Sequence, residues 1–179
     1  MKPSLFALCL LVSVSTFAQD GLKNKGLFYK FSLAATLRTN SDYVVTRDDG
    51  NTLIQLNGLF INNSLGYQFD RRASVALNVE YDHYFKQSFN FMPVYATFRY
   101  NVLDFDDRLF LRAGYGKLFD MGAHFENGTM YKAGIGIQTF DANYRNSWLF
   151  GLDFSRKRFG YRQEDKLSSV AIFIEFMLF

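Results

Sequence analysis

Cysteine is nearly absent from this chain of 179 residues, which contains one cysteine, two histidines and two prolines. The single cysteine, Cys9, lies in an apolar N-terminal segment, so the rest of the chain has no thiol to form a disulfide, ligate a metal or attack a substrate. Long hydrophobic runs are absent too: after that segment no stretch reaches about 18 consecutive apolar residues. These absences exclude thiol chemistry and membrane-spanning helices.

A strong excess of charge of one sign is also missing. Lys and Arg number 20 against 17 Asp and Glu, a net charge of +3, which gives no basic face for nucleic acid. Aromatic residues are abundant instead, at 18% of the chain, although the mean hydropathy is only −0.09. The chain therefore uses many aromatic side chains without long hydrophobic runs.

The N-terminus has the layout of a secretory signal peptide. A positive charge at Lys2 precedes an apolar stretch over residues 5–14, and small and polar residues follow up to Ala18. We expect export and cleavage after residue 18, which leaves residues 19–179 as one domain.

Apolar and polar residues alternate with a period of two along the rest of the chain. In residues 73–85 one parity carries Ala73, Val75, Leu77, Val79, Tyr81 and Phe85, and the other carries Ser74, Ala76, Asn78, Glu80 and Asp82. Successive side chains of a strand point to opposite faces, so each such segment predicts an amphipathic β-strand. Eight segments show the pattern: 29–38, 59–69, 73–85, 94–100, 109–116, 131–138, 148–155 and 170–178.

Eight amphipathic strands can close in two ways, as a soluble barrel with the apolar face inside or as a membrane barrel with that face toward lipid. The apolar faces carry large residues almost without interruption, whereas the opposite faces mix small residues with isolated charges. That mixture suits a narrow lumen better than a solvated surface, which would carry dense Lys and Glu. We therefore predict an all-β, eight-stranded antiparallel up-and-down transmembrane β-barrel, with a soluble ligand-binding barrel as the alternative.

The connections between the segments alternate in length. "TNSDYVVTRDDGNT", "FDMGAHFENGT" and "SRKRFGYRQEDK" are long, whereas "DRR", "LDFDD" and "DANYRN" are short. Long loops on one side and tight turns on the other are typical of outer-membrane barrels, with both chain ends on the short-turn side. In the first long connection "RDDGN" (47–51) indicates a hairpin tip, since it has too few carboxylates for a calcium site.

Over residues 27–179 the chain resembles the small outer-membrane barrels of Gram-negative envelopes, the OmpA/OmpX-type and "porin family" proteins. The resemblance rests on the signal peptide, the alternation of apolar and polar residues, the unequal loop lengths and the terminal aromatic residue. The resemblance implies an outer-membrane location and a last strand that is read by the barrel-assembly machinery. Two positions break the simple pattern. Phe179 is out of phase with the lipid-facing Leu178, which predicts a twist at the rim. Around Pro93 the apolar parity changes, which predicts either a bulge or a strand that begins at Val94.

On the polar face of the predicted strands the numbers of positive and negative side chains are nearly equal. This is expected in a lumen, because charges in a low-dielectric interior must be paired. We expect Lys30 to contact Glu175 near the periplasmic rim and Lys132 to contact Asp153 near the outer rim. Glycines in "RAGYG" (112–116) and "KAGIG" (132–136) would leave room for the long side chains beside them. The predicted lumen charge network comprises Lys30, Glu80, Asp82, Arg99, Arg112, Lys132, Asp153 and Glu175.

The last long connection carries a net positive charge that could contact lipopolysaccharide phosphates. Its candidate residues are Arg156, Lys157, Arg158 and Arg162. The other expected partners are outer-membrane lipid and an outer-membrane protein; nucleic acid is not expected.

We predict no catalytic residue, no cofactor and no metal site. An eight-stranded lumen is filled by side chains, so a role in envelope structure, in adhesion or as a subunit of a larger outer-membrane complex is favoured. One alternative is a narrow channel. Another is a lipid A-modifying enzyme, because "HFENG" (124–128) loosely resembles the His-x-Ser-Asn-Gly stretch of lipid A deacylases. Glu126 stands in place of the nucleophilic serine there, which removes the nucleophile.

Overall fold

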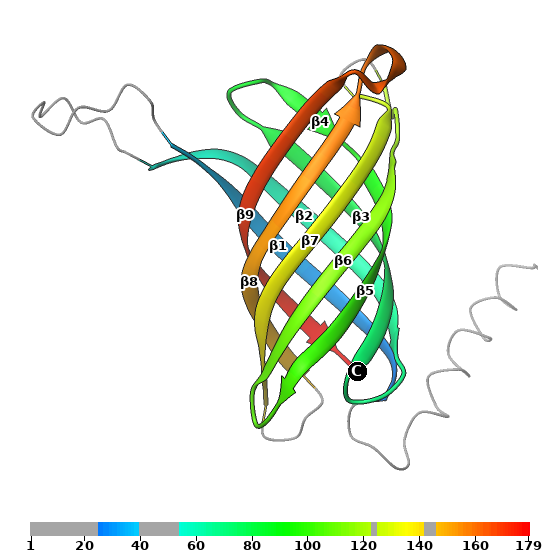
Figure 1. The fold of residues 1–179 in the computed structure, drawn as a ribbon, viewed down its shortest axis with the longest axis vertical. Coiled ribbons are helices and arrows are strands. Elements are labelled where there is room, and N and C mark those ends of the chain that lie inside the picture. Colours follow the sequence, from blue (N-terminus) through cyan, green and yellow to red (C-terminus); the bar gives the residue numbers. More distant parts are fainter. Residues whose placement is uncertain (1–24, 40–53, 123–124, 142–145) are drawn as a thin grey trace, which may run out of the picture.

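The computed structural model describes residues 25–39, 54–122, 125–141 and 146–179. The signal peptide, the tip at 47–51 and His124 lie outside these residues. Nine strands and one short 3-10 turn (Tyr161–Gln163) make up the described chain (Figure 1). The strands are β1 (Gly26–Thr39), β2 (Ile54–Gln68), β3 (Ala73–Tyr84), β4 (Phe89–Phe91), β5 (Pro93–Asp104), β6 (Arg108–Leu118), β7 (Gly128–Phe140), β8 (Asn146–Phe159) and β9 (Asp165–Leu178).

The sheet is antiparallel and closes on itself. Its order is β2-β1-β9-β8-β7-β6-β5-β3-β4, and a further pairing of β2 with β3 completes the ring. Because β4 and β5 both pair with β3, at successive heights, they share one position in the wall. The wall therefore has eight positions, and the predicted eight-stranded antiparallel barrel is confirmed.

The two parities of each strand face as predicted. On β3, Val75, Leu77 and Val79 are 40%, 58% and 46% exposed, whereas Glu80 and Asp82 are only 2% and 0% exposed. The apolar parity thus forms the outer surface and the polar parity fills the interior, the arrangement of a barrel that sits in lipid. Among the described residues no helix has the length and apolar character to cross a membrane.

The wall is interrupted at Met92, between β4 and β5, but no residue is inserted there. Phe91 pairs with Asp82 and Val94 with Val79, so the register with β3 is the same on both sides of the interruption. The predicted bulge is therefore wrong, and β5 begins at Pro93, one residue before the predicted start. Phe91 and Pro93 are both buried on the inner parity. Inward and outward residues therefore alternate without a break through Met92, and the apparent change of parity arises because Phe91, an aromatic residue, points inward.

Bulges occur elsewhere, where the register shifts between Thr36 and Leu37 opposite β2 and between Asn101 and Leu103 opposite β6. The C-terminus needs no twist. Leu178 is 40% exposed, and Phe179 follows the alternation by packing its ring edge-on against the buried Phe28, with centroids 5.9 Å apart. The predicted twist is wrong for the same reason as the bulge, since an aromatic residue faces inward.

The connections keep the predicted asymmetry, with one correction. The β2–β3 and β5–β6 turns lie at the same end as the C-terminus, at the bottom of Figure 1. At the other end, the predicted long loop over residues 155–166 is mostly strand, because only residues 160–164 separate β8 from β9. Arg156, Lys157 and Arg158 consequently belong to β8 and alternate between its faces.

Candidate functional site: the barrel interior and its outer rim

Strand alternation delivers charged side chains into the interior from almost every part of the wall. Each of the eight predicted residues lies on the inner parity and is at most 8% exposed. They come from β1 (Lys30), β3 (Glu80 and Asp82), β5 (Arg99), β6 (Arg112), β7 (Lys132), β8 (Asp153) and β9 (Glu175).

Arg112 is the centre of the ion-pair chain. Its Nε and Nη2 donate to the two carboxylate oxygens of Asp153 at 2.8 and 2.7 Å, and its Nη1 donates to Glu175 Oε1 at 2.5 Å. Lys30 Nζ donates to the other oxygen of Glu175 at 3.0 Å. The guanidinium also lies over the Phe173 ring, 3.8 Å from its centroid. The bidentate pair and the ring fix the orientation of the guanidinium across the lumen.

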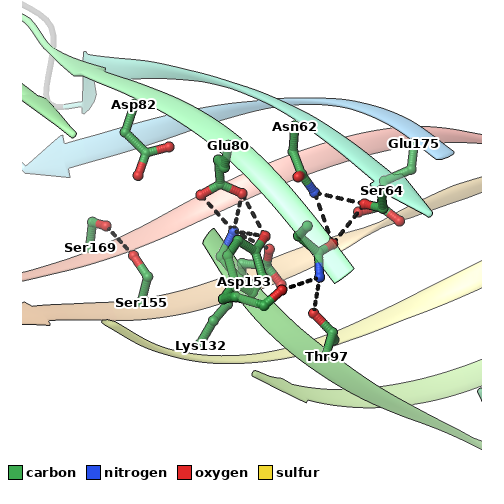
Figure 2. A network of polar contacts seen from close by, with 12 residues as sticks. Asn62, Ser64, Glu80, Asp82, Thr97, Lys132, Asp153, Ser155, Ser169 and Glu175 are labelled. Atoms are coloured by element: carbon green, nitrogen blue, oxygen red, sulfur yellow. Dashed lines mark hydrogen bonds and ion pairs between the residues drawn. The ribbon is translucent and has the colours of Figure 1, made fainter. Parts of the chain in front are cut away.

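The series of ion pairs continues from Asp153 through Lys132 to Glu80 (Figure 2). Lys132 Nζ is 3.5 Å from Asp153 Oδ2, but it is closer to Glu80, at 2.6 and 2.9 Å from the two oxygens. The Tyr95 hydroxyl donates to Glu80 Oε2 at 2.7 Å and accepts from Lys132 at 3.1 Å. We call the linked residues Lys30, Glu175, Arg112, Asp153, Lys132 and Glu80 the lumen network.

The structure brings together both predicted pairs, Lys30 with Glu175 and Lys132 with Asp153. The two pairs do not lie separately near opposite rims as predicted, because Arg112 contacts an acid of each pair and links them. Asp153 lies at the middle of β8, so the second pair is at mid-height rather than near the outer rim. Register alone could not predict this, since the strands tilt around the barrel.

Glycines on the inner parity clear the space that these side chains occupy. A Cβ at Gly134 would lie 2.1 Å from Asp153 Oδ1 and 3.1 Å from Arg112 Nε. A Cβ at Gly136 would lie 2.6 Å from the Phe110 ring, and one at Gly151 would lie 2.8 Å from the Phe173 ring. These glycines leave room because larger side chains from the neighbouring strands, which pair directly with them, fill the same volume.

Arg99 is not part of the lumen network. Its Nη2 donates to Gln68 Oε1 at 2.7 Å and its guanidinium lies 5.4 Å from the Phe110 centroid. Among the described residues no carboxylate is within ion-pair distance of it. Amide and ring contacts thus take the place of an acid beside this cation, and its buried Nε has no hydrogen-bond partner among the described residues.

Lys157 overturns the prediction that it belongs to a lipopolysaccharide-contacting loop. It lies on the inner parity of β8, is fully buried, and its Nζ is 2.9 Å from Asp82 Oδ2. Its ammonium donates to the Tyr84 hydroxyl at 3.0 Å and lies 4.8 to 5.5 Å from the centroids of three rings. Those rings belong to Phe60, Tyr84 and Phe91. Lys157 is therefore the partner of Asp82 inside the barrel.

A layer of aromatic rings that the sequence pattern did not predict surrounds Lys157. Phe91 packs against Tyr84 and Phe159 with ring centroids 5.8 and 5.0 Å apart, and Phe60 packs against Tyr84 at 5.2 Å. All four rings are at most 6% exposed. The signal was present in the sequence, since each ring occupies the polar parity of its strand. We call Phe60, Tyr84, Phe91 and Phe159 the aromatic layer.

The other three predicted loop cations remain outside. Arg156 and Arg158 lie on the outward parity of β8 and are exposed, and Arg162 is exposed in the 3-10 turn. In the part of the chain that the structure describes, no group of three or more His, Cys, Asp or Glu side chains is arranged to hold a metal ion. The charged groups of the lumen network, by contrast, are held in ion pairs with one another.

Comparison with known proteins identifies the fold. The chain matches no protein-family model and no curated protein. Among solved structures it is similar to neisserial surface protein A (NspA), with a TM-score of 0.60 and 14% identity, over 86% of this chain and 98% of that one. A solved structure from the de novo design of transmembrane β-barrels also matches, with a TM-score of 0.46 and 14% identity, over 86% of this chain and 96% of that one. So does the outer-membrane protein AlkL (0.43, 11%, 90% of each). The likeness to NspA shows the fold of a small outer-membrane β-barrel.

Proposed function

We propose that this chain is an integral outer-membrane protein with a closed interior, which acts through its outer surface and loops rather than by catalysis or bulk transport. The observation that carries the proposal is the filling of the lumen. The lumen network crosses the barrel at mid-height, and the aromatic layer with Lys157 and Asp82 lies toward the outer end. Roles that remain for such a barrel are envelope structure, adhesion, or service as a subunit of a larger outer-membrane complex.

Ion conductance tests the closed interior. The purified full chain, reconstituted in a planar bilayer, should give no steady conductance steps, because ion pairs and rings occupy the path. A variant that removes two rings of the aromatic layer and the central guanidinium (Phe60→Ala, Phe91→Ala and Arg112→Ala) should conduct if it inserts. Steady conductance by the unaltered protein would replace this proposal with the narrow-channel alternative.

Location and partners need their own measurement. Fractionation should recover the protein in the outer membrane, in a form that migrates faster before boiling than after it on a gel, as closed barrels do. Affinity purification from native outer membranes then separates a solitary barrel from a subunit, because only a subunit brings a constant partner. Recovery in the soluble fraction would contradict the proposal.

A further inference from the structure

The outward face of the barrel changes character abruptly near the outer end of β8. Phe150, Leu152 and Phe154 point outward and are 45%, 47% and 50% exposed. The next two residues of the same parity are Arg156 and Arg158, both exposed. Since the apolar part of this face contacts acyl chains if the barrel spans the outer membrane, the two arginines lie where the headgroups of the outer leaflet begin.

Strand pairing extends these arginines into a row. Arg158 pairs with Lys166 on β9 and with Thr129 on β7, and Thr129 pairs with Lys117 on β6. Paired residues share a face, and Lys117 and Lys166 are exposed on it. Neighbouring strands are about 4.8 Å apart, so the row spans roughly 15 Å of the rim. We call Lys117, Arg156, Arg158 and Lys166 the basic row.

An aromatic pair lies beside Arg156, two residues along the strands below the level of Lys117 and Arg158. Arg156 pairs with Tyr131, which pairs with Tyr115; the two tyrosines are 48% and 53% exposed and their ring centroids are 5.0 Å apart. Tyrosine at this depth is typical of the interface between acyl chains and headgroups. The order along the wall from below is therefore apolar, aromatic and cationic, which matches a lipid with acyl chains and an anionic head.

The cations of the basic row are not neutralised by the protein. No described carboxylate is within ion-pair distance of any of the four, although Asp120, Glu126 and Glu164 occur in the flanking connections and Asp165 begins β9. This contrasts with the interior, where every lysine has a carboxylate partner. The opposite wall at the same end shows the apolar Leu56, Leu59 and Phe85 instead. The exposed Lys86 is the neighbour of Phe85 in that wall, so the clustering of cations, rather than their presence, distinguishes the basic row.

We propose that the basic row, with Arg162 above it, binds the phosphate groups of lipopolysaccharide in the outer leaflet. Arginine pairs with phosphate oxygens in a bidentate way, and a lysine on each side of Arg158 lets the row contact more than one phosphate of a headgroup. Acyl chains of the same lipid would lie along Tyr115, Tyr131 and Phe154. The inference rests on the proposed outer-membrane location and adds a ligand class to it.

A binding measurement tests the site. The probes are rough lipopolysaccharide and the same material after removal of its phosphates, added to the purified full chain in detergent. The variant Arg156→Gln, Arg158→Gln, Lys166→Gln should bind intact lipopolysaccharide roughly a hundredfold more weakly, since each cation near an anionic headgroup contributes about a factor of five. A matched control, Lys25→Gln, Arg71→Gln, Arg72→Gln, removes three exposed cations at the other end of the barrel, next to the β2–β3 turn, and should bind as the unaltered protein does.

Three outcomes would overturn the site: unchanged affinity of the variant, equal loss in the control, or equal affinity of the unaltered protein for the dephosphorylated lipid. Displacement of the lipid by inorganic phosphate would overturn the lipid as the ligand, because the acyl contacts with Tyr115 and Tyr131 would then contribute nothing. Gel migration before and after boiling shows that each variant is still a closed barrel. If the binding experiment contradicts this site, the results expected from fractionation and from the conductance measurement do not change. The failure of the site can therefore be distinguished from the failure of the proposed function.

Discussion

At the scale of single residues, a cation in this barrel is defined by what surrounds it. Arg112 and Lys157 are both buried cations with carboxylate partners, yet the first lies on one ring between two acids and the second lies among three rings beside one acid. Arg158 is one residue from Lys157 and has no carboxylate partner among the described residues, because it points the other way. One step along a strand separates a structural ion pair from a surface available to an anion.

Replacing Arg112 should destabilise the barrel strongly. Arg112→Met leaves Asp153 and Glu175 buried with only the lysines beside them, and breaking a buried pair costs about 3–5 kcal/mol of unfolding free energy. Urea unfolding in lipid vesicles, followed by the fluorescence of the single tryptophan Trp148, measures it. The control Arg71→Met, in the exposed β2–β3 turn, should change stability by about 0.5 kcal/mol or less. Equal effects of the two variants would show that the lumen network contributes nothing.

At the scale of elements, each tight turn must satisfy its own backbone groups. In the β2–β3 turn, Asp70 Oδ1 accepts the backbone N–H groups of Ala73 and Arg72, each at 2.7 Å, and Phe69 N donates to Ala73 O at 3.0 Å. The hydrogen bonds from Ala73 and Arg72 lower the pKa of Asp70 below its ordinary value of 3.8. The carboxylate form is therefore favoured in the folded state.

This shift predicts a pH dependence with a definite sign. Because the pKa of Asp70 is lower in the folded state, its contribution to stability is present above the ordinary value and is lost as the pH falls through the folded pKa. Asp70→Asn keeps an acceptor oxygen but cannot titrate. The stability difference between the unaltered protein and this variant should shrink when unfolding is measured from about pH 6 down to about pH 3. A difference that stays constant over that range would contradict the assignment.

At the scale of the whole molecule, closure decides which face meets which solvent. The outer surface shows large apolar side chains around the wall, while charged groups are collected inside, an inversion of a soluble barrel. Closure is uneven: β1 pairs with β9 only as far as Thr36 and Ala171, whereas β8 pairs with β9 along all of β9, up to Asp165. In Figure 1 the outer ends of β1 and β2 accordingly lean away from β9.

Membrane orientation predicts a depth-dependent cost of charge on the outer face. Ile135 lies near the middle of β7 and is 45% exposed, so Ile135→Arg places a cation among acyl chains and should cost about 2–4 kcal/mol of unfolding free energy in vesicles. Thr129→Arg, on the same face at the outer end of the strand, should cost about 0–1 kcal/mol. Similar costs at both depths, or none at Ile135, would mean that this face does not contact lipid.

Most of the fold was predictable because strand alternation is local. The period of two is visible in any ten residues, and large residues on one parity indicated which face meets lipid. The predictions were wrong at positions where the polarity of a residue does not match the face of the strand on which it lies. Phe91 and Phe179 are apolar but face inward, and charges on both parities of residues 155–158 made the outer end of β8 look like a loop. At those positions the residue type does not indicate whether a side chain points inward or outward, and only the pairing with neighbouring strands shows it.

The sequence by itself determined the class of fold, the number of wall positions and the faces of most side chains, since all of these follow from alternation and turn spacing. Only the tertiary structure decided which charges meet. Partners such as Arg112 and Glu175 come from strands far apart in the chain and not adjacent in the wall, and they meet through the tilt and closure of the barrel. A contact across a lumen depends on the height and angle of two strands, and no local pattern encodes either.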